Sequence, residues 1–114
     1  MKVVELKQKE RWRVFFNEGL WQAGLYRPEH ENIKEIDVLE KHDAPELFYL
    51  IRGNIVLVIG ENGKIREVGM EAEKAYIIKE WHNAYRPEGA EGLALVIERT
   101  NIRTEFKPIS EFQR

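Results

Sequence analysis

The chain has 114 residues, a length typical of one domain that buries roughly two thirds of the surface exposed by its unfolded form. It contains no cysteine, which excludes disulfides and Cys-ligated zinc or iron–sulfur sites and leaves imidazole, carboxylate and water as metal ligands. The net charge of −2 comes from 18 basic and 20 acidic residues mixed along the chain, so no basic stripe indicates nucleic-acid binding.

The first residues and the length of the apolar runs predict where the protein resides. Residues 1–10 carry charges where a signal peptide has an apolar core, and no apolar run approaches the roughly 20 residues of a membrane span. We therefore expect a cytoplasmic protein with no membrane partner. A surface rich in Glu and Lys is also the compositional signal of hyperthermophiles, with high solubility and chance as the alternative explanations.

Short runs with β-type alternation recur along the chain and are separated by turn residues. Residues 3–9 fit either a helical turn or two or a terminal strand. The predicted strands cover, in chain order, residues 11–16, 20–27, 33–40, 46–52, 55–60, 64–68, 75–79, 82–86 and 93–100. Asn62-Gly63 is the strongest hairpin signal, because a type I′ turn needs positive φ at both central residues. The pattern predicts a single all-β domain over residues 1–114, a small barrel or sandwich.

Alternation within the predicted strands directs several polar side chains to one place. If Ile36 and Val38 face the core, Glu40 and His42 continue the same stripe to the mouth of a barrel. The same period gives two further inward-facing sets: Glu46 with Phe48 and Leu50, and His82 with Ala84 and Arg86.

The spacing Glu40-x-His42-x3-Glu46-x6-Gly53, followed by His82, resembles the two-motif signature of the cupin superfamily over roughly residues 35 to 98. His42, Glu46 and Gly53 fall on the second histidine, the glutamate and the last glycine of the first motif. His82 falls on the histidine of the second motif, whereas Glu40 stands where the family's first histidine usually is. The resemblance, which is to the small single-domain cupins, implies a double-stranded β-helix or jelly-roll barrel whose lumen is the ligand cavity.

The same residues make chemical sense as a metal site. His42, His82 and Glu46 would supply two imidazoles and one carboxylate, leaving positions open for water, oxygen or substrate. With Glu40 the two carboxylates would balance a divalent ion, for which iron, manganese, zinc and nickel are the candidates. In the structural alternative each histidine is a hydrogen-bonded core residue and Glu46 pairs with an arginine, Arg52 or Arg86, in a barrel without metal.

Arg86 is the candidate substrate contact, because a guanidinium facing the lumen would bind an anionic group. A structural salt bridge is the alternative role for it. Gly53 is interpreted as a turn glycine without a catalytic role. The only serine is Ser110 near the end of the chain, which excludes a Gly-x-Ser-x-Gly serine hydrolase.

These observations support three hypotheses about function. The first is a metal-dependent enzyme acting on a small polar molecule, either an isomerase or epimerase of a sugar-like compound or an oxygenase. The second is a non-catalytic cupin that binds or senses a small ligand, with or without metal. The third is a structural partner of another protein through residues 46–52. Fold alone does not decide among them.

We also expect a homodimer. Small cupins commonly pair through terminal strands, and residues 1–19 are the segment expected in the dimer contact. The outward-facing positions of the strand over residues 46–52 are apolar as well, as they would be if a second subunit covered them; they are Leu47, Tyr49 and Ile51.

Overall fold

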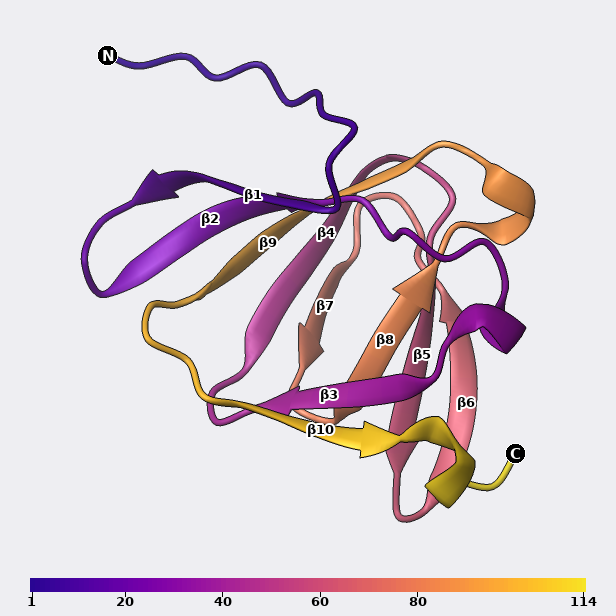
Figure 1. The fold of residues 1–114 in the computed structure, drawn as a ribbon. Helices are drawn as coiled ribbons and strands as arrows, with labels where there is room; N and C mark the ends of the chain where they lie inside the picture. Colours follow the sequence, from indigo (N-terminus) through magenta and orange to yellow (C-terminus); the bar gives the residue numbers. More distant parts are fainter.

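Two five-stranded antiparallel sheets face each other in the computed structural model, which describes all residues 1–114 (Figure 1). The first sheet has the order β1-β2-β9-β4-β7, formed by Trp12–Asn17, Trp21–Tyr26, Gly92–Arg99, Glu46–Gly53 and Ala75–Ile78. The second has the order β10-β3-β8-β5-β6, formed by Thr104–Pro108, Val38–His42, Trp81–Tyr85, Val56–Glu61 and Lys64–Gly69. Short 3₁₀ turns lie at Ile33–Glu35, Pro87–Gly89 and Ile109–Glu111. The predicted all-β jelly roll is confirmed, and no helix is long and apolar enough to cross a bilayer.

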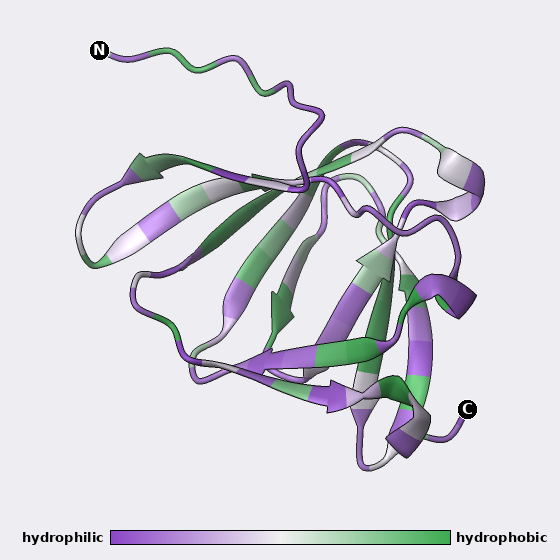
Figure 2. Cartoon of the chain, viewed as in Figure 1, coloured by the Kyte–Doolittle hydropathy of each residue, from purple (hydrophilic) through white to green (hydrophobic).

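The main core lies between the two sheets and is built by alternate residues of β4, β5, β7, β8 and β9. Figure 2 shows the corresponding hydrophobic segments along β4, β5 and β9. Each fully buried aliphatic side chain in such a core contributes roughly 1.5–3 kcal/mol. The core cluster consists of Phe48, Leu50, Ile55, Leu57, Ile59, Met70, Ile78, Ala84, Ala94 and Val96.

A second, smaller core covers the outer face of the second sheet. Leu39 and Val58 are fully buried there beneath Ile109 and Phe112 of the C-terminal turn. This packing corrects the predicted alternation of the third strand, in which Ile36 and Val38 were expected to share the buried face. Ile36 is buried as predicted, but Val38 is exposed, because the strand begins only there and the C-terminal turn covers Leu39 instead.

Two predicted elements differ from the structure for local reasons. The strand expected over residues 33–40 divides into the 3₁₀ turn Ile33–Glu35 and strand β3, because the Asn32 side chain accepts a hydrogen bond from the Lys34 amide and caps the turn. Strand β10 was not predicted, because its sequence shows no apolar alternation and ends in Pro108. It pairs with β3 and so borders the predicted site.

Residues 3–9 form neither the helical turn nor the terminal strand that were expected. Side chains hold this segment instead. Gln8 Nε2 donates to the carbonyl of Leu25 at 2.7 Å, and Arg52 Nη2 donates to the carbonyl of Leu6 at 2.5 Å. The first residues extend away from the body of the protein (Figure 1).

The hairpin between β5 and β6 confirms the Asn62-Gly63 prediction. Glu61 pairs with Lys64, and the two residues between them have φ of 54° and 74°. Both central residues therefore lie in the left-handed region that a type I′ turn requires.

Gly53 is required by both its backbone angle and its surroundings. Its φ is 80°, and a Cβ atom there would lie 2.0 Å from the carbonyl oxygen of Glu91. Gly53→Ala is expected to lower the free energy of unfolding by about 2–4 kcal/mol in urea titrations. Gly69→Ala is the matched control, since its Cβ would meet nothing within 4 Å. Equal losses in the two variants would contradict the steric argument.

Candidate metal centre

Three strands bring the predicted ligands together. Glu40 and His42 lie two residues apart on β3 and therefore share a face, and His82 on β8 is paired directly with Glu40 across the second sheet. Glu46 is the first residue of β4, in the opposing sheet. The site therefore lies between the sheets, with donors from both.

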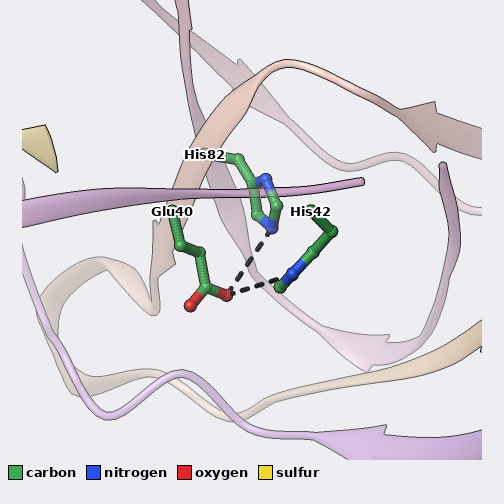
Figure 3. Close-up of side chains that lie close together, drawn as sticks. All are labelled: Glu40, His42 and His82. Atoms are coloured by element: carbon green, nitrogen blue, oxygen red, sulfur yellow. Dashed lines mark ion pairs between the residues drawn. The ribbon is translucent and has the colours of Figure 1, made fainter. Parts of the chain in front are cut away.

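The donor atoms converge on one point (Figure 3). The ligand atoms of Glu40, His42 and His82 all lie within 4.8 Å of one another, and Glu40 Oε1 is 3.6 Å and 3.7 Å from the two Nε2 atoms. Glu46 Oε1 lies 2.5 Å from His42 Nε2 and 3.5 Å from His82 Nε2. Ligands held at about 2.1 Å from one ion are themselves about 3–4 Å apart, so most of these separations are already of the right size.

Each imidazole is oriented through its other ring nitrogen. His82 Nδ1 lies 2.9 Å from the carbonyl oxygen of Glu80, which can only accept, so Nδ1 carries the proton and Nε2 presents its lone pair. His42 Nδ1 lies 2.9 Å from Thr104 Oγ1 on β10. Such outer contacts are typical of histidines that bind metals, because they fix the tautomer and the ring plane.

Burial makes this arrangement costly unless something satisfies it. Glu46 and His82 are only 4% and 5% exposed; His82 Nε2 has no hydrogen-bond partner, and Glu46 Oε1 has none beyond its ion pair with His42. A buried polar atom left unpaired costs about 1–3 kcal/mol. A cation bound by both atoms would satisfy them, so this donor set of two imidazoles and two carboxylates fits a divalent metal ion.

The pKa values of the acid and base groups are displaced in opposite directions. Burial raises the pKa of Glu46, but the adjacent imidazoles of His42 and His82 outweigh it and lower that pKa to about 2. For His42, burial lowers the pKa, while Glu40 and Glu46 outweigh it and raise the pKa to about 10. Without metal, His42 is therefore an imidazolium held by two carboxylates.

A cavity of about 170 Å³ opens onto these donors. Its apolar walls include Trp12, Phe48 and Val96. Glu98 also lines it, accepting a hydrogen bond from Gln22 at 2.7 Å. Burial raises the pKa of Glu98, and the nearby charge of Glu46 adds to that effect.

Sequence reasoning missed three residues that line this cavity, Arg11, Tyr26 and Glu98. Burial raises the pKa of the Tyr26 phenol. Glu98 could have been found, because it follows Val96 at the two-residue period of a predicted strand. Arg11 was included in the predicted strand over residues 11–16, but the observed strand begins at Trp12, so alternation did not direct Arg11 to the cavity.

The arginines considered as partners of Glu46 lie elsewhere. Arg86 is buried and donates to the carbonyl oxygens of Pro28, Gly89 and Ala90, so the structure does not bring it into the cavity. Arg52 pairs with Glu91 at 2.7 Å.

No family model and no curated protein matches the chain, but solved structures do. A cupin-2 domain containing protein from Shewanella frigidimarina superposes with a TM-score of 0.60, with 82% of this chain and 83% of that one covered at 21% identity. The chain has a cupin fold. The polyketide cyclase RemF from Streptomyces resistomycificus has a TM-score of 0.62 at 19% identity, with 90% and 84% of the two chains covered. The cobalt(II) form of HppE in complex with its substrate has a TM-score of 0.62 at 12% identity, and 84% of this chain and 57% of that one are covered.

Proposed function

We propose that this cupin binds one divalent metal ion through His42, His82, Glu46 and Glu40, and that it acts on a small polar molecule in the adjoining cavity. The observation that carries the proposal is the buried, unpartnered His82 Nε2, which lies within 4.8 Å of the ligand atoms of Glu40 and His42 and 3.5 Å from the buried Glu46 Oε1. Iron, manganese, zinc and nickel all suit such a mixed imidazole and carboxylate set.

A bound divalent ion would supply Lewis acidity to an oxygen of the substrate. The chain's own residues would contribute position and charge. Trp12 and Phe48 form an apolar wall of the cavity, and Thr104 and the Glu80 carbonyl hold the imidazoles in orientation.

Glu98 favours proton transfer among the reactions open to such a site. Its carboxyl lies on the cavity wall, with the pKa raised by burial, so it is suited to hold and release a proton beside a bound substrate. An isomerase or epimerase needs such a group, whereas an oxygenase does not. We therefore place isomerisation or epimerisation ahead of oxygenation.

A non-catalytic role in binding or sensing a small ligand is the second candidate. It is favoured by the cavity volume of about 170 Å³, which is below the range of about 300–1,000 Å³ for pockets that hold drug-sized ligands. Turnover of any compound that binds in a metal-dependent way would exclude it.

Elemental analysis tests the metal proposal directly. Protein purified without added metal, and then reconstituted anaerobically with each candidate ion, is expected to hold about one ion per chain. The proposal fails if every reconstituted sample, after desalting, holds less than roughly a tenth of an equivalent.

We further propose that the protein is a homodimer in the cytoplasm and that the outer face of the first sheet forms the contact. Leu47 of β4 pairs with Ile77 on one side and Ile97 on the other, and both of these isoleucines are exposed. The exposed side chains of Phe16 and Trp21 continue the apolar surface onto β1 and β2, and Phe16 belongs to residues 1–19, the segment expected in the dimer contact. Monomeric proteins rarely leave so continuous an apolar row uncovered.

Light scattering is expected to give twice the chain mass at micromolar concentration. Charging the row with Ile77→Lys and Ile97→Lys together should weaken association by about 100-fold, since two unpaired charges would be buried. Val38→Lys, at an exposed position of the second sheet, is the control and should not change the mass. A wild-type monomer at these concentrations would refute the dimer.

A further inference from the structure

Arg11 is the only Lys or Arg among the residues that line the cavity. It lies just before β1, and its carbonyl accepts a hydrogen bond from the Arg27 amide at 2.9 Å, which fixes its backbone beside the cavity mouth. Given the proposed metal site, we propose that Arg11 binds the anionic group of the ligand and that this ligand is a small organic carboxylate.

The guanidinium of Arg11 is free to make such a contact. Its nearest carboxylate is Glu29, whose Oε1 lies 3.9 Å from Nε, and the two side chains are 50% and 61% exposed. An exposed pair at that distance contributes little. No hydrogen bond uses the guanidinium, in contrast to Arg86 and Arg52, which both donate to backbone carbonyls. Cζ of Arg11 stands 5.9 Å from the centre of the Tyr26 ring, a stacking position that leaves the donors unoccupied.

The charges around the cavity require a cation at this position if an anion is to enter. Three carboxylates line it, those of Glu40, Glu46 and Glu98. A divalent ion would balance two of these charges, and Arg11 would balance the third whenever Glu98 is ionised. Removing Arg11 would therefore turn a neutral cavity into one that repels anions.

The size and walls of the cavity define the ligand class. A volume of about 170 Å³ admits a molecule of few atoms, and Trp12, Phe48 and Val96 offer it apolar contact. One guanidinium matches one carboxylate through two parallel hydrogen bonds. A short hydroxy or keto acid, with its carboxylate on Arg11 and its second oxygen toward the metal donors, meets all three conditions.

Paired neutral and anionic probes test this assignment. Cobalt(II)-loaded protein is titrated with glycolate and lactate, and with the neutral analogues glycolamide and lactamide, by cobalt absorption and by calorimetry. Arg11→Gln is expected to lower the affinity for the two carboxylates by about 10- to 100-fold, because charge-assisted hydrogen bonds are lost. The affinity for the two amides should fall by less than about 3-fold. Arg11→Lys should retain part of the preference for carboxylates.

Arg13→Gln is the matched control. Arg13 has the same charge, but it donates a hydrogen bond to the Gln8 side chain and does not line the cavity. Its loss should therefore leave the affinity for both ligand classes unchanged. The proposal is overturned if neither carboxylate binds wild-type protein, if carboxylates bind no more tightly than amides, or if Arg11→Gln weakens both classes equally.

The cobalt content separates this result from the proposed function. Arg11→Gln should keep one cobalt per chain while losing its selectivity for anions. If wild-type protein binds no cobalt, the same probes measured by calorimetry on metal-free protein still decide the role of Arg11, and elemental analysis with the candidate ions decides the metal proposal separately.

Discussion

His82→Ala is expected to lower the metal affinity by more than about 100-fold, so that protein purified without added metal contains none. The change removes a buried donor whose orientation is fixed by the Glu80 carbonyl and whose Nε2 lies 3.5 Å from Glu46 Oε1. Removing a direct ligand should lower the metal affinity by more than the 10- to 100-fold that is typical of removing a residue that only orients a ligand. His42→Ala should behave in the same way, because its Nε2 contacts both carboxylates. Metal content and competition with a chelator measure both effects.

Two further variants make this result specific. His30→Ala alters the remaining histidine, whose only nearby acid is Glu29 at 3.8 Å, and should leave metal content unchanged. Thr104→Val removes the hydroxyl next to His42 Nδ1 and should lower the metal affinity by about 10- to 100-fold without abolishing metal binding. Far-UV circular dichroism confirms that each variant is folded. A folded His82→Ala protein that retains a full equivalent of metal would contradict the proposed ligand set.

The strands that sequence predicted best are those with well-defined faces. Alternation placed Phe48 and Leu50 with Glu46, and Ala84 with His82, on inward faces, and all five are buried. A period of two is decisive when one face of a strand meets a packed core.

Alternation misled where packing depends on distant residues. Val38 and Leu39 exchange their expected roles because Ile109 and Phe112, about seventy residues later, cover the outer face of the second sheet. The sequence around Val38 and Leu39 contains no signal that predicts this contact. The missing strand β10 is the same case, since its polar sequence is ordered by pairing with β3 rather than by its own pattern.

The candidate site divides along the same line. Its donors could be proposed from the sequence, because Glu40, His42 and Glu46 are close together and the resemblance to the two cupin motifs joined His82 to them. The residues that surround them could not. Thr104 reaches the site only because β10 pairs with β3, and Arg11 is placed by the segment that leads into β1. Arg86 was predicted to face the lumen, but its guanidinium donates to backbone carbonyls instead.

Metal affinity is expected to rise about tenfold for each pH unit between pH 7 and pH 9, with about one proton released per ion bound. The reason is the competition at His42. Burial lowers its pKa, but Glu40 and Glu46 raise it to about 10, so an ion must displace a proton there throughout this range. Glu46, with a pKa lowered to about 2, is already ionised and releases none. Chelator competition at each pH, together with proton release in weakly buffered solution, gives the slope; an affinity independent of pH would contradict this account.

The stability of the metal-free protein should follow the opposite trend, which provides an internal check. The His42 contribution is complete below its ordinary pKa of 6.5 and is lost as the pH rises through about 10. The Glu46 contribution is complete above its ordinary pKa of 4.5 and is lost as the pH falls through about 2. Metal-free protein should therefore have its highest Tm between these two ordinary values and should melt roughly 5–10 °C lower near pH 10. The Tm difference between loaded and metal-free protein then widens from pH 6.5 upward. The proton on His42 stabilises the metal-free protein, and the same proton competes with the metal ion for His42.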